Sequence, residues 1–222
     1  MDRVAFRNTC SKLGIELSDA QLSAFDAFEC ALYAVNQHTN LTRIPQAACW
    51  LRHFVDSLLI AKFLPDGASV LDIGTGPGFP AWPLACVRPD LKVTALDSNG
   101  KMLGFLKGHP LPNLAVVQAR AEDEPRRERF DVVTGRALAP LPIQLELSAA
   151  PCKVSGMVLP MRTPNDEPFG EAAAGLGLEL VGVHRVDLPE TDAVRVFPEY
   201  RKVSATSRAF PRPWAEIRSS YR

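Results

Sequence analysis

Three glycines alternate with other residues directly after a short apolar run, in the stretch VLDIGTGPGFPAWPLA at 70–85. These glycines, Gly74, Gly76 and Gly78, permit a sharp turn and let the backbone approach a ligand, because they have no Cβ. The run before them ends at Asp72 and predicts a strand, and Pro80 suits the start of a helix. In an open α/β sheet such a turn lies at the strand ends, where ligands bind.

The spacing of the glycines narrows the class of ligand. A dinucleotide site has the form G-x-G-x-x-G, and its third glycine would fall at Phe79. A phosphate loop needs a lysine after its last glycine, and none follows. The D-x-G-x-G-x-G form instead resembles the cofactor loop of class I methyltransferases, which bind S-adenosylmethionine. The alternative is a glycine turn with a purely structural role.

Two later segments extend this predicted site. Asp97 ends the run KVTALD at 92–97, where a carboxylate is able to accept both hydroxyls of a ribose. The alternative is an acid at a helix start with Ser98 as the cap. Ala121 and Glu122 follow a third apolar run and offer a backbone N–H and an acceptor for the edge of an adenine. Taken alone, they form only an acidic turn.

Arg136, after the fourth apolar run, is the candidate for the methyl acceptor side. Its planar fork suits phosphate, carboxylate or the O6/N7 edge of guanine. The N/D-P-P-Y/F/W tetrad of amino-group methyltransferases is absent, and Cys152 lies in a predicted turn rather than at this strand end. No paired carboxylates accompany Arg136, which fits guanine N7, since its free lone pair requires positioning rather than a base. The alternative is an ion pair with Asp72 or Glu122.

The spacing of apolar residues predicts the helices and strands that position these residues. Apolar runs predict strands, and helical spacing predicts helices at 18–36, with a Ser18–Gln21 capping box, and at 46–64. The predicted fold is α/β: a Rossmann-like class I methyltransferase sheet, mostly parallel with an antiparallel last strand, helices on both faces and an N-terminal helical extension. The predicted strands are 69–73, 92–96, 114–118, 130–134, 157–161, 178–186 and one within 193–205.

Three segments are expected. Residues 1–66 form a helical segment packed on the core, 67–205 form the cofactor-binding domain, and 206–222 form a basic C-terminal tail. Polar residues near the first junction are too polar for simple core positions, and His53 among them is predicted to be structural rather than a base. These junction residues are Asn40, Arg52, His53 and Asp56.

Composition excludes several classes of protein. The 222 residues have no net charge and are 46% hydrophobic, as is usual for a globular protein. Five unclustered cysteines indicate reduced thiols in a cytoplasmic protein and no metal site. Neither a signal peptide nor a run of about 20 apolar residues is present, so no membrane contact is expected. Residues 195–222 contain seven basic and two acidic side chains, which predicts either a phosphate-facing patch or a solvated tail.

Five segments together resemble one family. They are NLTRI at 40–44, RHFVDSL at 52–58, the glycine loop at 70–85, LDSNGKMLGFL at 96–106 and GRALAPL at 135–141. The combination is similar to the RsmG (GidB) family, bacterial methyltransferases that place a methyl group on N7 of a guanine in small-subunit (16S) ribosomal RNA. The resemblance runs from about 25 to 210.

The resemblance implies residue roles and shows departures. It implies that Gly74, Phe79, Ala121, Glu122 and Arg136 contact the cofactor. The family's usual Ser-Arg-Ala is Gly-Arg-Ala at 135–137, and its frequent Leu-Lys-Gly is Met-Arg-Thr at 161–163. The helix after the second strand is short and predicted to be irregular, because it carries glycines at 100, 104 and 108.

The predicted enzyme is therefore an S-adenosylmethionine-dependent methyltransferase, a cytoplasmic monomer whose partner is small-subunit ribosomal RNA or the 30S subunit. Two alternatives stay open: a class I methyltransferase acting on another RNA, a small molecule or a protein, and a non-catalytic adenosyl-binding or scaffold protein. Arg136 is the predicted catalytic residue. The predicted cofactor-binding residues are Gly74, Gly76, Gly78, Phe79, Asp97, Ala121, Glu122 and Arg136. The predicted RNA-binding residues are Arg136, Arg162, Arg212 and Arg218.

Overall fold

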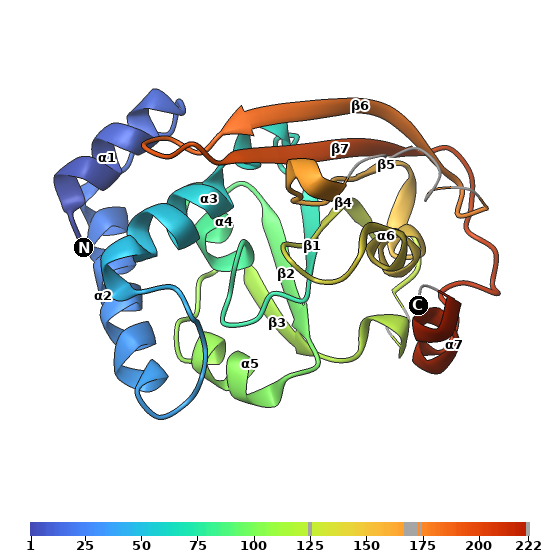
Figure 1. Ribbon diagram of the computed structural model, residues 1–222, viewed down its shortest axis with the longest axis horizontal. Helices are drawn as coiled ribbons and strands as arrows, with labels where there is room; N and C mark the ends of the chain where they lie inside the picture. The colour runs from blue at the N-terminus through green and yellow to red at the C-terminus, as the bar shows by residue number, and fades with distance from the viewer. Residues whose placement is uncertain (124–125, 167–172, 174, 221–222) are drawn as a thin grey trace.

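A seven-stranded sheet forms the centre of the computed structural model, which describes residues 1–123, 126–166, 173 and 175–220 (Figure 1). The strand order in the described part of the chain is β3-β2-β1-β4-β5-β7-β6. The strands are β1 (Ser69–Ile73), β2 (Lys92–Asp97), β3 (Leu114–Gln118), β4 (Phe130–Thr134), β5 (Cys152–Val158), β6 (Leu178–Asp187) and β7 (Val194–Lys202).

The sheet confirms the predicted topology. β1 pairs in parallel with β2 and with β4, so the strand order reverses between β1 and β4. β7 runs antiparallel to both β5 and β6, and it is the last strand in the chain. The carboxyl ends of β1 and β4 therefore flank the crevice in which sheets of this kind hold their ligands.

The predicted strands match β1, β3 and β4 closely, whereas β5 differs from its prediction. β5 begins at Cys152, five residues before the predicted start, and Cys152 pairs with Phe130. The register shifts between Phe130 and Val132, and this irregularity accommodates the extra residues. Placing Cys152 in a turn was therefore wrong. Burial raises the pKa of its thiol to about 12, which leaves it without nucleophilic character.

Helices precede and connect the strands. The Ser18–Gln21 capping box is present, and it starts α2 as the sequence predicts. The predicted helix at 46–64 is instead a broken series of 3₁₀, π and α turns. The helical elements are α1 (Arg3–Lys12), α2 (Asp19–Asn36), η1 (Gln46–Ala48), η2 (Trp50–Val55), α3 (Asp56–Leu58), η3 (Ala61–Phe63), α4 (Ala81–Val87), α5 (Gly100–Lys107), η4 (Ala121–Asp123), α6 (Leu141–Ala149), η5 (Pro164–Asp166) and α7 (Trp214–Ser220).

The helix after β2 is regular, contrary to the prediction. Asn99 is its N-cap, and its side chain accepts hydrogen bonds from the backbone of Lys101 and Met102. Gly100 and Gly108 lie at the two ends of α5, where the helix penalty of glycine is small. The buried side chains of this helix then hold it against the sheet.

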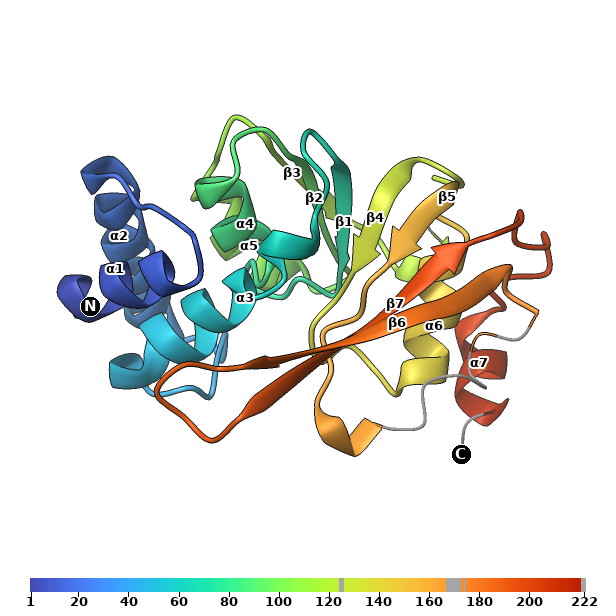
Figure 2. The same cartoon turned by 90° about the horizontal axis from the view of Figure 1, so that it is seen from above.

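Helices cover both faces of the sheet, as expected (Figure 2). The helices α4 and α5 and the N-terminal helices share one hydrophobic core on one face. On the other face, α6 and the buried Ile217 of α7 share a second core. Almost every residue of α6 is buried, including the polar side chains of Gln144, Glu146 and Ser148.

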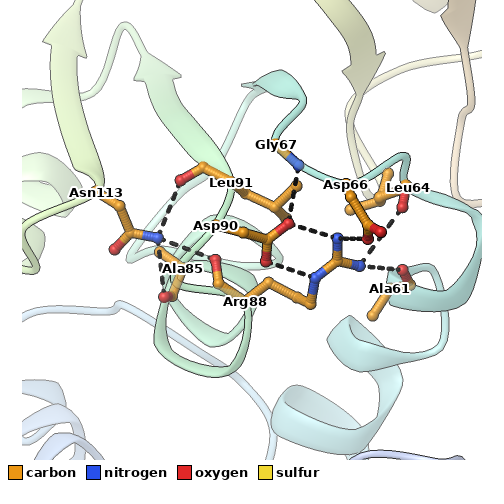
Figure 3. Close-up of polar contacts among 9 residues, drawn as sticks. All are labelled: Ala61, Leu64, Asp66, Gly67, Ala85, Arg88, Asp90, Leu91 and Asn113. Carbon is orange, nitrogen blue, oxygen red and sulfur yellow. Dashed lines mark hydrogen bonds and ion pairs between the residues drawn. The ribbon is translucent and has the colours of Figure 1, made fainter.

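Arg88 fastens the N-terminal segment to the sheet domain (Figure 3). It follows α4, and its guanidinium donates to the carbonyls of Ala61 and Leu64 and to the carboxylates of Asp66 and Asp90. These carbonyl groups lie at the end of the broken helical series, where the Ala61 carbonyl also accepts from the backbone N–H of Leu64 and Arg88 supplies a donor to the Leu64 carbonyl. The N-terminal helices and the sheet domain therefore pack as neighbours in the structure.

Residues 206–220 also pack against the sheet domain. Arg212 binds both carboxylate oxygens of Glu146, a buried residue of α6, at 3.0 and 2.7 Å. Arg127 donates to the carbonyls of Thr206 and Phe210 at 2.7 and 2.8 Å. The boundaries at 66 and 205 stay predictions, and the last two residues of the expected tail lie outside the described residues. No described helix has the length and apolar character that crossing a membrane requires.

Candidate active site

Two adjoining pockets open at the carboxyl ends of the central strands. The strand-end pocket, about 410 Å³, includes Gly74, Asp97, Ala121, Glu122 and Trp214 in its lining. The arginine pocket is about 860 Å³. Its charged lining residues are Arg52, Asp56, Arg136, Arg162 and Arg195.

The glycine loop has backbone angles that other residues rarely adopt. The φ angles of Gly74, Gly76 and Gly78 are +74°, +58° and +120°. A Cβ on Gly74 would also come within 2.5 Å of the Leu138 side chain, and one on Gly78 would meet Leu106 at 2.8 Å. The backbone conformation therefore favours glycine at all three positions, and at Gly74 and Gly78 a Cβ would also force a leucine side chain to move.

Asp97 joins the end of β2 to this loop. One carboxylate oxygen accepts from the backbone N–H of Gly76 and the other from that of Asn99, each at 2.8 Å. A carboxylate has about four lone-pair sites, so acceptor capacity remains for a ligand in the strand-end pocket. The cap of the following helix is Asn99 rather than Ser98.

Asp72 has a structural position beneath the loop. It is fully buried and does not contribute to the lining of either pocket. Its Oδ2 accepts from the backbone N–H of Ala81 at 3.1 Å, at the start of α4. Burial raises the pKa of Asp72 to about 7, while its hydrogen bonds oppose that rise.

Ala121 and Glu122 belong to η4, and both line the strand-end pocket together with Gly74 of the glycine loop. The Glu122 carboxylate forms an ion pair with Arg120. The Arg120 guanidinium also lies over the indole of Trp214, 5.6 Å from the ring centroid. The pocket therefore ends in a cluster of one acid, one arginine and one aromatic ring.

Arg136 lines the arginine pocket and contacts the N-terminal segment. One terminal nitrogen donates to Asp56 Oδ2 at 3.1 Å and to the carbonyl of Arg52 at 3.3 Å. The other donates to Nδ1 of His53 at 3.1 Å. The ion-pair partner is thus Asp56, and both partners considered from the sequence, Asp72 and Glu122, were wrong.

His53 is held in one neutral form. Because arginine only donates, the contact with Arg136 makes Nδ1 the acceptor, and Nε2–H then donates to Thr42 Oγ1 at 2.7 Å. Burial, together with the charge of Arg136, lowers the pKa of His53 to about 3. Both ring nitrogens have protein partners, which favours the predicted structural role.

Asp56 balances two arginines. Its Oδ1 accepts from Nε of Arg195 on β7 at 2.6 Å, while Oδ2 accepts from Arg136. Burial lowers the pKa of Arg136, and the carboxylate of Asp56 opposes this shift, so the guanidinium stays charged. Asp56 thereby connects three parts of the chain around the arginine pocket.

A short wall separates the two pockets. Ala137 and Ala139 line both of them, and Ala137 has a φ of +52°, which is unusual for alanine. Arg162 donates to the carbonyl of Ala139 at 2.7 Å and to Oε1 of Gln144 at 3.0 Å. Gln144 in turn donates to the carbonyl of Gly135 at 2.8 Å. Arg162 and Gln144 therefore hold the wall in place.

The structure distributes the predicted cofactor residues over three places. Gly74, Asp97, Ala121 and Glu122 line the strand-end pocket, and Arg136 lines its neighbour. Gly76, Gly78 and Phe79 line neither. The buried ring of Phe79 stacks on that of His53, with centroids 4.2 Å apart, and lies 5.3 Å from the Arg136 guanidinium.

The predicted RNA-binding residues also separate. Arg136 and Arg162 line the arginine pocket, whereas Arg212 is bound to Glu146 and Arg218 is exposed on α7. Their roles toward RNA stay predictions.

Sequence reasoning placed Asp56 among the polar junction residues and Arg195 in the basic 195–222 segment, but it linked neither of them to Arg136. It assigned no role to Trp214, which gave no signal.

Comparisons with known proteins fit this geometry. Residues 21–173 match the family model described as GidB, rRNA small subunit methyltransferase G. The ribosomal RNA small subunit methyltransferase G of Lactobacillus delbrueckii subsp. bulgaricus is 37% identical, over 96% of this chain and 96% of its own. The protein of that name from Roseiflexus castenholzii is 36% identical, over 90% and 91%.

Solved structures show the same fold. A TehB-like SAM-dependent methyltransferase from Corynebacterium glutamicum has a TM-score of 0.57 at 20% identity, covering 78% of this chain and 97% of its own. A SAM-dependent methyltransferase from Aquifex aeolicus has a TM-score of 0.53 at 20% identity, covering 68% and 92%. With the sequence matches over most of both chains, these findings show that the chain belongs to the GidB family, rRNA small subunit methyltransferase G.

Proposed function

We propose that this protein transfers a methyl group from S-adenosylmethionine to N7 of a guanine in small-subunit ribosomal RNA. The observation that carries the proposal is the pair of adjoining pockets. One is built from a glycine loop and a carboxylate at strand ends, and the other is lined by arginines. The wall at Ala137 and Ala139 borders both, so a donor on one side and an acceptor on the other come close together.

The strand-end pocket fits the cofactor. Its volume of about 410 Å³ lies within the range of small-molecule sites. The remaining lone pairs of Asp97 suit ribose hydroxyls, and the residues around Ala121 and Glu122 suit the base. Gly74 has no side chain, so its backbone is accessible to a ligand at the loop, where a Cβ would meet Leu138.

The chemistry asks mainly for positioning. S-adenosylmethionine supplies an electrophilic methyl group, which the N7 lone pair accepts as the carbon–sulfur bond breaks. N7 has no proton to lose, so no general base is needed. His53 agrees with this, because it is neutral and both its nitrogens are occupied by Arg136 and Thr42.

Arg136 is the proposed residue that orients the target base. Guanine offers O6 and N7 as acceptors, and O6 is free to accept a hydrogen bond while N7 reacts. Hydrogen bonds within the described part of the chain use three of the five guanidinium donors of Arg136. The remaining donors belong to a side chain that lines the arginine pocket, where a base would enter.

The RNA backbone is the proposed partner of the surrounding cations. Arg52, Arg162 and Arg195 line the same pocket, and within the described lining Asp56 is the single carboxylate. Arg218 and the accessible part of Arg212 lie on the C-terminal segment and are proposed to add phosphate contacts. We further propose a monomer that acts in the cytoplasm on ribosomal RNA or on the 30S subunit.

The test uses tritiated S-adenosylmethionine with ribosomal RNA and with 30S subunits, followed by digestion and identification of the labelled nucleoside. The expected product is 7-methylguanosine. Gly74→Val should abolish labelling, while Gly67→Val is the matched control, because Gly67 also has a positive φ but lies outside both pockets. Label in another nucleoside would contradict the N7 assignment.

The two alternatives give different outcomes. A methyltransferase of small molecules or proteins would bind cofactor and leave all RNA unlabelled, and its substrate binding would not weaken steeply with salt. A non-catalytic adenosyl-binding or scaffold protein would bind cofactor without turnover on any substrate. The family membership and the arginine pocket favour the RNA enzyme over both.

A further inference from the structure

The C-terminal helix brings an aromatic ring to the strand-end pocket. Trp214, the first residue of α7, lines this pocket together with Ala119, Arg120 and Ala121 from the end of β3. Its side chain is half-buried, and the Arg120 guanidinium lies 5.6 Å from its ring centroid. We infer that Trp214 forms the wall of the adenine end of the cofactor site, so that the C-terminal segment belongs to the binding machinery.

The position of Trp214 is fixed by contacts on both sides of it. Before it, Arg212 binds Glu146 of α6 through its side chain and its backbone N–H. After it, Ile217 is completely buried in the core that α6 shares with the sheet. Arg212 also donates to Ser220 Oγ at 2.9 Å, which joins the segment before α7 to the last residue of that helix. The indole is therefore held by the fold rather than carried on a loose tail.

The chemistry of the cluster suits a purine. This step rests on the proposed function, which puts adenine beside Ala121 and Glu122. An aromatic ring offers a flat face for a base, and stacking of a base on an aromatic side chain is a general mode of nucleotide binding. The indole already holds one planar group against its face, because the guanidinium of Arg120 lies over the ring.

Two variants of the full chain test the inference. Trp214→Ala and Trp214→Phe are titrated with S-adenosylhomocysteine by calorimetry. Loss of the ring should weaken binding by roughly 5- to 150-fold, the range that base stacking on aromatic side chains spans. Phenylalanine keeps a stacking face, so this variant should recover most of the affinity. The matched control is Trp50→Phe, which removes an indole that lines neither pocket and should leave affinity within about twofold of the wild type.

A spectroscopic measurement separates a binding role from a structural one. The full-length wild type is labelled with 5-fluorotryptophan, and the Trp214 resonance is assigned by its absence from the spectrum of the Trp214→Phe variant. Adenosine, which carries the base and ribose without the methionine part, should shift this resonance in a saturable way. The resonance of Trp50, which lines neither pocket, should not move.

Each outcome supports or overturns the inference. Wild-type affinity in Trp214→Ala, or an unmoved Trp214 resonance at saturating adenosine, overturns it while leaving the proposed function intact. If the wild type binds neither S-adenosylhomocysteine nor adenosine, the proposed function and this inference are both overturned. Weakened binding in Trp214→Ala with rescue by phenylalanine and a shifted resonance supports it.

Discussion

Two arginines, Arg88 and Arg136, join the same N-terminal segment to the sheet domain at different places. Arg88 follows α4 and reaches the end of the broken helical series, at Ala61, Leu64 and Asp66 (Figure 3). Arg136 follows β4 and reaches the beginning and middle of that series, at Arg52, His53 and Asp56. Both make charged hydrogen bonds to side chains and to backbone carbonyls.

The difference between them lies in how many donors the protein uses. All five N–H donors of Arg88 have acceptors, which are two carbonyls, one oxygen of Asp66 and both oxygens of Asp90. Arg136 has acceptors for three of its five within the described residues, and it lines a cavity. A saturated arginine anchors the fold, whereas an arginine with donors to spare in a pocket has capacity for a ligand.

The largest expected effect comes from Asp56, which balances Arg136 and Arg195. Asp56→Ala leaves two poorly solvated cations without their carboxylate and should lower the free energy of unfolding by about 3–5 kcal/mol. Asp56→Asn keeps the shape and one acceptor oxygen, so its loss should be smaller. Urea unfolding of the ligand-free proteins measures both. A loss below about 1 kcal/mol in the alanine variant would contradict the network.

The next effect concerns the methyl-transfer rate. Loss of a charged hydrogen bond to the target base is worth about 1.5–3 kcal/mol, so Arg136→Ala should slow single-turnover methylation by roughly ten- to a hundredfold. Arg136→Lys keeps the charge without the planar fork and should restore the rate only in part. Affinity for S-adenosylhomocysteine is measured in parallel. A variant with wild-type rate and affinity would show that Arg136 is structural.

Arg88 should give the opposite result. Arg88→Ala removes the side-chain donor of the Leu64 carbonyl and one of two donors of the Ala61 carbonyl, and it should lower the free energy of unfolding by about 1–2 kcal/mol. The single-turnover rate at saturating cofactor and RNA should change by less than about twofold. A large loss of rate in a folded Arg88→Ala protein would break the distinction between the two arginines.

The smallest effect is a pH dependence of the Arg88 contact. The hydrogen bond from Arg88, with that from Gly67 N–H, lowers the pKa of Asp90 below its ordinary value. A depressed carboxyl pKa stabilises the fold above the unfolded-state pKa of about 4, and this contribution disappears as the pH falls through the folded-state pKa.

Wild type and Arg88→Ala should therefore differ less in stability below about pH 4 than at pH 7. The change should be at most about 1 kcal/mol, because Asp90 is largely exposed and its ion pair is screened by water. Denaturation curves at several pH values test this. A gap that stays constant down to pH 2.5 would show that the two carbonyl contacts alone account for the role of Arg88.

The parts of the fold that depend on residues close together in the sequence could be predicted. The strands β1, β3 and β4 follow from β-branched runs, and α2 follows from its capping box and apolar spacing. The breaks in the helical series after α2 could not be predicted from the sequence. Its apolar residues keep one helical spacing, while tertiary packing changes the period of the backbone hydrogen bonds. The start of β5 depended on a register shift against β4, which has no local signal.

The same division applies to the candidate site. The glycine loop and Asp97 are a local motif, since each follows a strand whose end the sequence shows. The Arg136 network joins residues 80 and more positions apart. Its acid, Asp56, lies in a helical turn that the sequence placed near the junction of the first two segments. Trp214 reaches its pocket only because the chain returns across α6, which no pattern near Trp214 indicates.

The shared wall at Ala137 and Ala139 has a thermodynamic consequence. A ligand that shifts this segment on one side changes the free energy of binding on the other, and linkage makes the coupling reciprocal. If RNA binding tightens cofactor binding by some factor, cofactor tightens RNA binding by the same factor. Gln144 lines neither pocket but donates to the carbonyl of Gly135 and accepts from Arg162, so it would then influence the size of that cooperativity without contacting either ligand.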